Sequence, residues 1–285
     1  MVTLSDHYLN NTLSFNPAFA GCDDALSISI LYRNQWVGFE DAPKSNAFSV
    51  HTPLRNDRIG LGFFIEQGSY GINRETTFAG NYAYRMEMRN GILALGLGLG
   101  VNVKYTAWNE LNAADENDIL LTNNKETAVL PDFSIGLYYY NKKYFVGFSV
   151  PMLLTHELNS NTGKYTVKND FSDYNYFIEG GYYFRITPQI RVLPSFLLKY
   201  NPGHAPQADI NGHLILSDRV WLGLGYRTSK TLLGMLQINI TRQIMAAYSY
   251  SFDSGSVGQN SNGSHEVVLN YLFSYSRKVT SPRQY

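Results

Sequence analysis

The chain has 285 residues, of which 16% are charged and 14% aromatic, and it contains 24 glycines and 22 tyrosines. Its 23 Lys and Arg residues equal its 23 Asp and Glu residues in number, so neither nucleic acid nor an acidic surface is expected as the main partner. One cysteine, Cys22, excludes an internal disulfide framework and a cysteine metal cluster.

About fourteen stretches alternate apolar with polar residues. This is the period-two pattern of a strand, because successive strand side chains point to opposite faces. The stretches lie at 26–36, 45–52, 59–66, 78–87, 91–105, 133–139, 144–150, 175–184, 190–200, 207–216, 220–227, 232–240, 244–253 and 266–273. No apolar run approaches the roughly 20 residues of a transmembrane helix.

The clearest of these stretches is Gly91–Tyr105. Its apolar register is Leu93, Leu95, Leu97, Leu99, Val101 and Val103, and the other register holds Ala94, Gly96, Gly98, Gly100, Asn102 and Lys104. Strands of soluble sheets usually have about five or six residues, whereas a tilted strand needs roughly 9 to 11 to cross a bilayer. The stretch therefore favours a transmembrane β-barrel, although taken alone it also fits a central strand of a large soluble sandwich.

The connections between the stretches alternate in length. The tight ones are Leu54–Asp57, Arg89–Gly91, Asn141–Lys143, Ile186–Pro188, Ser217–Arg219 and Thr241–Arg242. The longer ones are Phe39–Pro43, Gly68–Glu75, Ala107–Leu130, Leu154–Asp173, Asn201–Pro206 and Ser254–Gly263, with a brief Ser229-Lys230 connection as the exception. Outer-membrane barrels have this asymmetry, with short turns in the periplasm and longer loops outside the cell.

Charged residues supply the second argument for a barrel, because they fall on the register opposite the apolar row. They are Arg33, Glu66, Arg85, Glu87, Lys104, Glu179, Arg191, Lys199, Asp209, Arg227, Asp253 and Glu266. A charge facing lipid at the midplane costs about 2 to 4 kcal/mol, so these side chains must face a lumen. Six basic and six acidic groups with no dominant sign predict a lumen that is blocked or conducts poorly.

The predicted fold is an all-β, transmembrane, antiparallel up-and-down β-barrel of about 14 strands, with short periplasmic turns and longer extracellular loops. We assign residues 1–24 to a periplasmic N-terminal segment, 25–275 to the outer-membrane barrel and 276–285 to a periplasmic tail. Residues 1–10 lack the basic start and apolar core of a signal peptide, so the expectation is a mature outer-membrane chain.

No pattern in the sequence indicates catalysis. Ser49 and His51 share a register, whereas neighbours in Ser264-His265-Glu266 point to opposite faces and cannot form a triad. The six histidines show no metal-ligand spacing. The glycine row of Gly91–Tyr105 fits small residues lining a curved strand better than a phosphate loop. The expectation is a protein that is not an enzyme and needs no cofactor or metal.

Three ordered motifs near the start of the chain carry a family resemblance. They are Asn16-Pro17-Ala18-Phe19-Ala20-Gly21, then Tyr32-Arg33-Asn34-Gln35-Trp36-Val37-Gly38, then Ser49-Val50-His51-Thr52-Pro53-Leu54. This series resembles the PorP/SprF family of Bacteroidetes outer-membrane proteins, whose members share an N-P-A-[YF]-A-G start, a Y-R-x-Q-W-x-G strand and an S-x-H-x-P-L hairpin. Gly263-Ser264-His265-Glu266 is similar to the usual ending of the family, and the tail after Ser276 departs from its pattern.

The resemblance implies an outer-membrane barrel of the type IX secretion system, needed for secretion or surface anchoring of particular large adhesins, including those of gliding motility. The partners it implies are a cell-surface adhesin or its C-terminal secretion domain, other secretion components or a periplasmic or plug protein, and outer-membrane lipid. The alternative function is a channel or transporter for small or hydrophobic solutes. The motif residues are either structural or partner-binding, and the sequence leaves both possibilities open.

Ala107–Leu130 is the candidate partner-binding loop. It places Trp108 at its base and Asp115, Glu116 and Asp118 beyond, and an aromatic anchor with a polar rim is what a protein-binding patch requires. Aromatic residues also gather at the bilayer boundary without any partner, which is the alternative interpretation of Trp108.

Overall fold

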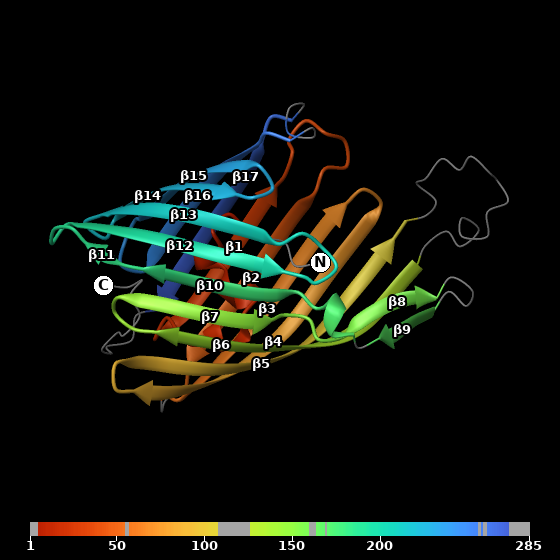
Figure 1. Ribbon diagram of the computed structural model, residues 1–285, viewed down its shortest axis with the longest axis horizontal. Coiled ribbons are helices and arrows are strands. Elements are labelled where there is room, and N and C mark those ends of the chain that lie inside the picture. Colours follow the sequence, from red (N-terminus) through yellow and green to blue (C-terminus); the bar gives the residue numbers. More distant parts are fainter. Residues whose placement is uncertain are drawn as a thin grey trace.

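The computed structural model describes residues 5–54, 57–107, 126–159, 164–168, 170–255, 258 and 261–273, and these form an antiparallel barrel (Figure 1). Its strands are β1 (Leu26–Asn34), β2 (Lys44–Pro53), β3 (Ile59–Tyr70), β4 (Asn73–Met88), β5 (Gly91–Thr106), β6 (Glu126–Tyr140), β7 (Tyr144–Val150), β10 (Tyr176–Tyr182), β11 (Phe184–Arg185), β12 (Ile190–Tyr200), β13 (Gln207–Leu216), β14 (Val220–Arg227), β15 (Thr231–Asn239), β16 (Ile244–Asp253) and β17 (Ser264–Phe273). Among the described residues, no helix is long and apolar enough to cross a membrane.

The sheet closes on itself into a barrel. The first strand, β1, pairs with the last, β17, and β10 pairs with both β7 and β12. The sheet has 15 strands, and β11 continues β10 along β12, so 14 positions surround the lumen. The predicted all-β barrel of about 14 strands is confirmed.

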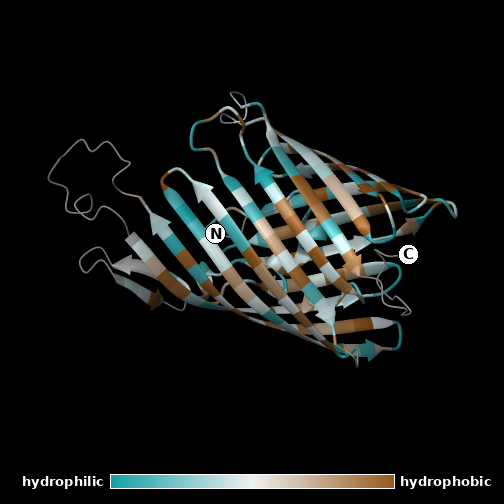
Figure 2. Ribbon diagram, turned by 180° about the vertical axis from the view of Figure 1, so that it is seen from behind, coloured by the Kyte–Doolittle hydropathy of each residue, from teal (hydrophilic) through white to brown (hydrophobic). Residues whose placement is uncertain are grey.

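Side chains alternate between the two faces of this wall as the sequence pattern predicts. On β5, Leu97 and Leu99 are each 60% exposed on the outer surface, whereas Ala94 is 0% exposed on the inner one. The charged residues Arg33, Glu179 and Glu266 are buried on the lumen side. Figure 2 shows the resulting mixture of hydrophobic and hydrophilic positions along single strands. The wall thus presents apolar surface to lipid and keeps charge inside.

Two predicted long loops contain more regular structure than the sequence indicates. Gly68–Glu75 is not a loop, because β3 and β4 continue into it and meet in the two-residue turn Gly71-Ile72. The pairs Gly68–Glu75, Ser69–Arg74 and Tyr70–Asn73 extend the ladder to this turn. Leu154–Asp173 contains a separate hairpin, β8 (Thr155–Asn159) with β9 (Lys164–Lys168), and the short 3-10 helix η5 (Phe171–Asp173).

The part of the N-terminal segment that is described lies inside the barrel instead of below it. Every residue from Ser5 to Asp23 is buried except Asn10 and Ser14, which are half-buried. Three 3-10 turns shape this stretch, η1 (Tyr8–Asn10), η2 (Thr12–Ser14) and η3 (Pro17–Phe19). The sequence analysis assigned residues 1–24 to the periplasm. A search for period-two strands gives no information about where a short irregular segment lies.

Several predicted features fall outside the described residues. They are Trp108, Asp115, Glu116 and Asp118 of the candidate partner-binding loop, and the tail 276–285.

The orientation of the barrel can be tested with cysteines placed at its two ends. Gly203 lies in the connection between β12 and β13 on the long-loop side, and Asn90 in the turn between β4 and β5 on the opposite side. We expect a membrane-impermeant maleimide to label Gly203→Cys but not Asn90→Cys on intact cells, because long loops face outward. Native Cys22 is 1% exposed and serves as the unlabelled background. Labelling at position 90 alone would invert the orientation.

Candidate functional site: a plugged lumen and the cavity above it

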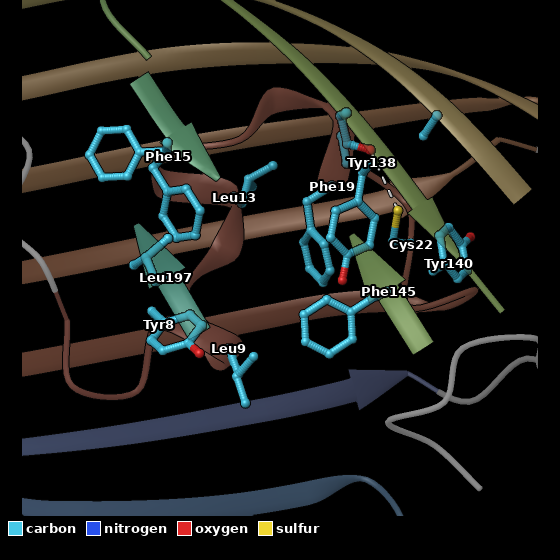
Figure 3. Packing of buried hydrophobic residues seen from close by; sticks show 14 of the residues in the cluster. Tyr8, Leu9, Leu13, Phe15, Phe19, Cys22, Tyr138, Tyr140, Phe145 and Leu197 are labelled. Atoms are coloured by element: carbon cyan, nitrogen blue, oxygen red, sulfur yellow. Dashed lines mark hydrogen bonds between the residues drawn. The ribbon is translucent and has the colours of Figure 1, made fainter. Parts of the chain in front are cut away.

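Residues 5–24, called the plug from here on, fill the lumen with apolar side chains. Tyr8, Leu9, Phe15 and Phe19 are each 7% exposed or less. They form one buried cluster with wall residues that point inward: Ala83, Ala94, Tyr138, Tyr140, Phe145, Phe177, Tyr183, Leu193, Leu197, Ile215 and Trp221 (Figure 3). This is a protein core inside a barrel, since a water-filled channel has a polar interior.

The first residues of the plug are held by a buried ionic network. Asp6 Oδ1 lies 2.8 Å from Arg33 Nη1 and 3.2 Å from Arg227 Nη2. Arg33 also donates to Glu266 Oε2 at 2.9 Å, and Arg227 donates to both carboxylate oxygens of Asp209. Each buried charge therefore has a partner of opposite sign, which a group removed from water requires.

Glu266 anchors the plug backbone to the closing seam of the barrel. Its carboxylate accepts the hydroxyl of Ser5 at 2.5 Å and the amides of Asp6 and His7 at 3.1 and 3.0 Å. Glu266 on β17 is the direct cross-strand partner of Arg33 on β1. The plug is thus bonded to the first and the last strand at once.

The end of the plug is fixed near the short turns. Asn16 donates from Nδ2 to the Leu137 carbonyl at 3.1 Å and accepts the Ala18 amide, which caps η3. The Gly21 amide donates to His51 Nδ1 at 3.1 Å, and His51 Nε2 lies 3.3 Å from Asp23 Oδ2. Below these contacts, Arg85 pairs with Asp24 and donates to the Tyr140 hydroxyl at 2.7 Å.

Glycines in the wall make room for the plug backbone. A Cβ built on Gly96 would lie 2.0 Å from the Ala18 nitrogen, and one on Gly60 would lie 1.9 Å from the Ala20 oxygen. A Cβ on Gly136 would lie 2.1 Å from Asn16 Oδ1. In the sequence analysis, the glycine row that includes Gly96 was interpreted as small residues lining a curved strand. That interpretation omitted the plug backbone, which lies against these glycines.

The structure brings the motifs together in two pairs. The Asn16–Gly21 motif meets the Ser49–Leu54 motif, where Phe19 packs edge-on against His51 at 5.4 Å between ring centroids. Gly21 has a φ of +79° and lies against the Pro53 backbone. Of the remaining hairpin motif residues, Ser49 is buried and Leu54 is 38% exposed.

The second pair joins the Tyr32–Gly38 motif to Gly263–Glu266 across the seam. Besides Arg33 and Glu266, the Trp36 amide donates to Ser264 Oγ at 3.0 Å and the Val37 amide to the Gly263 carbonyl at 2.8 Å. Tyr32 faces outward and is 45% exposed. Gln35 lines the cavity described below.

The arrangement around His51 does not prepare Ser49 for nucleophilic attack. The Nδ1 atom of His51 accepts the Gly21 amide, and its Nε2 atom faces Asp23, so both ring nitrogens are engaged by the plug. A general base needs one nitrogen free for the serine hydroxyl. Among the described residues, no group of three or more His, Cys, Asp or Glu side chains could hold a metal ion.

Above the plug, on the long-loop side, lies a cavity of about 470 Å³, called the upper cavity. Arg33, Glu66 and Arg227 line it near the plug, and Trp36 and Tyr70 line it farther out. A smaller cavity of about 70 Å³ lies beside Phe19, Asp23 and His51 and has no lining residue in common with the upper one.

Sequence reasoning missed the plug residues Ser5, Asp6 and His7. A usable signal was present on the wall, because Phe145, Phe177, Leu193 and Leu197 are apolar at positions of the inward register. A water-filled lumen gives no reason for such side chains, whereas a core does.

Comparison with family models gives one finding that covers nearly the whole chain. The family described as "Type IX secretion system membrane protein PorP/SprF" matches residues 2–271. The comparison with curated proteins found no match.

Solved structures of outer-membrane barrels resemble the fold at low sequence identity. The CymD monoaromatic hydrocarbon channel is 10% identical, with a TM-score of 0.55 and coverage of 97% of this chain and 96% of that one. Omp33 of Acinetobacter baumannii is 5% identical, with a TM-score of 0.52 and coverage of 88% and 100%. The Ralstonia pickettii toluene transporter TbuX is 10% identical, with a TM-score of 0.52 and coverage of 91% and 92%. At these identities the likeness extends to the fold alone.

The filled lumen predicts that the pure protein lacks steady, porin-like conductance in planar bilayers. Ions would have to cross a buried apolar core, and 14 strands leave less room than a 16-stranded porin even without a plug. A 16-stranded porin reconstituted in the same bilayers is the positive control. Large, steady conductance of this protein would show that the plug does not seal the lumen.

Gly96→Ala tests the glycine contact, with Gly80→Ala as the matched control. The new Cβ at 96 overlaps plug backbone, whereas the nearest atom to one at 80 is the Leu99 oxygen at 4.0 Å. Burial raises the pKa of the Cys22 thiol to about 12, so a seated plug keeps this thiol unreactive. Overpacking typically costs about 1–3 kcal/mol, so we expect maleimide to label Cys22 roughly 10- to 100-fold faster in Gly96→Ala. Equal rates of Cys22 labelling in folded Gly96→Ala and folded Gly80→Ala would contradict the contact between Gly96 and the plug backbone.

Proposed function

The chain belongs to the PorP/SprF family of type IX secretion system membrane proteins, and we propose that it anchors or assists particular large adhesins at the cell surface instead of conducting solutes. The protein is an outer-membrane β-barrel. Membership of this family implies interaction with other secretion components. The choice of a large adhesin of the gliding motility type as cargo is our proposal.

The filled lumen is the observation that carries this proposal. A polypeptide cannot pass through the barrel while residues 5–24 occupy it, and neither can a hydrated solute of porin-like size. What remains available for function is the rim on the cell-surface side, since loops on a rigid scaffold are where partner contacts concentrate. An anchoring role uses this rim and needs no open lumen.

We also propose that the protein is not an enzyme. The family and the fold favour it, and His51 of the Ser49–His51 pair is engaged by the plug. The proposed division of the chain keeps 25–275 as the barrel and 276–285 as a periplasmic tail. The motif residues hold the plug and the seam, and we propose that a partner recognises the rim above them.

A channel or transporter for small or hydrophobic solutes is the second candidate function. The observation that favours it is the upper cavity, which is large enough for a small ligand. Transport would require the plug to move, and its ionic network and glycine contacts oppose that movement. Steady conductance of the pure protein would favour this candidate.

Deleting the gene is expected to abolish surface display of one or a few large adhesins while other secreted proteins still leave the cell. The reason is that an anchor acts on its own cargo, whereas a general conduit would affect every cargo. Quantitative proteomics of shaved cell-surface peptides, compared with culture supernatant, measures both. Unimpaired display of all large surface proteins in the deletion strain would remove the secretion role.

A loop replacement separates anchoring from barrel assembly. Exchanging residues 112–126 for a short Gly/Ser linker removes Asp115, Glu116 and Asp118 and leaves Trp108 in place. We expect an assembled, heat-modifiable barrel and loss of adhesin display. Normal display with this variant would exclude the loop as the partner site.

A further inference from the structure

The plug contacts two different parts of the barrel wall with its two ends. Residues 16–24, called the lower plug, contact strands from the first half of the sheet. These contacts are the Gly21 amide with His51 on β2, the Ala20 oxygen against Gly60 on β3, Asp24 with Arg85 on β4, Ala18 against Gly96 on β5 and Asn16 with the Leu137 carbonyl on β6. One short segment thus lies against five consecutive strands.

Residues 5–10, called the upper plug, contact strands from the second half of the sheet. The hydrogen-bonded pairs are Tyr8 with Ser195 on β12, Asp6 with Arg227 on β14, Asn10 with Gln237 on β15, Asp6 with Ser249 on β16 and His7 with Glu266 on β17, at 2.9 to 3.2 Å. The two ends of the plug therefore hold the two halves of the sheet together.

The seam between β1 and β17 joins these halves and carries a buried ion pair. Arg33 on β1 and Glu266 on β17 are direct cross-strand partners 2.9 Å apart, and they are 3% and 0% exposed. Within the described part of the chain, their other ionic and hydrogen-bonding partners are Ser5, Asp6 and His7 of the upper plug. A buried charge that lacks a partner is strongly destabilising. Closing the seam with both charges satisfied therefore requires the plug.

Loops beyond the strand ends reinforce the closed seam. The Trp36 amide donates to Ser264 Oγ at 3.0 Å, and Val37 donates to the Gly263 carbonyl and accepts from the Asn262 amide, each at 2.8 Å. Trp36 has a φ of +50°, which a bulky residue keeps only where the surrounding structure enforces it. The bonds that enforce it cross the seam, so this conformation is expected to form only on closure.

The lower plug can be in place before the seam closes, because its contacts join parts of the chain that are closer in sequence. The hydrogen bond from Gly21 to His51 spans 30 residues. The pair of Arg33 and Glu266 spans 233 residues. Contacts between distant residues tend to form late in folding, since loop entropy must be lost before they form. The expected order is the lower plug on β2 to β6 first and the pairing of β1 with β17 last.

A barrel that closed without the plug would be a poor intermediate. Phe145, Phe177, Leu193 and Leu197 belong to the cluster around the plug and are each 1% exposed or less. In an empty lumen these side chains would face water, and the favourable burial of their apolar surface would be lost. Seating the plug before closure avoids this state.

We propose that residues 5–24 act as an assembly template for the barrel. The lower plug seats on β2 to β6, and the second half of the sheet then closes around the upper plug, with Glu266 as the latch. The Asn16–Gly21 and Ser49–Leu54 motifs serve the seating step, and the Tyr32–Gly38 and Gly263–Glu266 motifs serve the closing step. This role is independent of the cargo that the finished barrel anchors.

The order of the two steps can be measured on the unmodified protein, because its single cysteine lies in the lower plug. Cys22 is 1% exposed and lies beside Tyr140 on β6 (Figure 3), so seating protects its thiol from a maleimide. The shift of the folded barrel on unheated SDS gels reports closure separately. During refolding from urea into detergent micelles, maleimide pulses are expected to stop labelling Cys22 before the shifted band appears. A shifted barrel whose Cys22 still reacts, or simultaneous onset of both signals, would overturn the proposed order.

Glu266→Gln tests the latch. The variant keeps the shape of the side chain but removes the charge that Arg33 and the upper plug share. We expect Cys22 to be protected at an unchanged rate and the shifted band to appear roughly tenfold more slowly or worse, because a contact made in the closing step affects its rate. Glu87→Gln makes the same change at an exposed position of β4 and should refold like the unmodified protein. Equal slowing by this control, or normal closure of Glu266→Gln, would contradict the role of Glu266.

Gly96→Ala tests whether closure depends on seating, and it keeps the proposal testable if Glu266→Gln does not fold. Position 96 lies on β5, several strands away from the seam, and a Cβ there would lie 2.0 Å from the Ala18 nitrogen. We expect slow protection of Cys22 together with equally slow closure, whereas Gly80→Ala should change neither. Slow protection with closure at the normal rate would show that the seam closes without the plug and would overturn the template role.

Discussion

The pairing of Asp6 with Arg33 and Arg227 is the interaction on which the arrangement of the lumen depends. A barrel in lipid must turn its charges inward, and in a lumen filled with protein those charges lose their water. Arg33 and Arg227 project from strands on the two sides of the seam region, and Asp6 reaches both. Removing this carboxylate would leave two buried cations with less compensation, and the plug would lose its upper attachment.

The lower part of the plug is held by close packing as well as by the contacts of Asp23 with His51 and of Asp24 with Arg85. Gly60, Gly96 and Gly136 allow its backbone to lie directly on the wall, and Phe19 packs between His51 and Tyr138. Contacts of this kind leave no free space between the plug and the wall, since protein interiors are packed as densely as organic crystals. The plug therefore behaves as part of the fold and not as a loosely placed gate.

The upper and lower attachments of the plug explain where the sequence motifs lie. The Asn16–Gly21 and Ser49–Leu54 motifs meet at the lower contacts of the plug, and the Tyr32–Gly38 motif meets Gly263–Glu266 at the seam beside the upper cavity. Most of these residues hold the plug and close the barrel. Trp36 differs from them because its strained backbone supports a side chain that lines an open cavity. The proposed anchoring function rests on the filled lumen.

The sequence by itself determined the wall of this protein. Period-two alternation depends only on neighbours along the chain, so the strands, the inward placement of Arg33 and Glu266 and the number of strands could all be predicted from it. The short irregular stretch 5–24 carries no such local period, and its place was decided by contacts with residues more than a hundred positions away, such as Glu266 and Leu137. The same reason applies to Gly96, whose need for a missing Cβ arises from Ala18 on another segment. Only the closed barrel brings these groups together, and only there do an inward-facing Leu193 and a buried Asp6 acquire the partners that explain them.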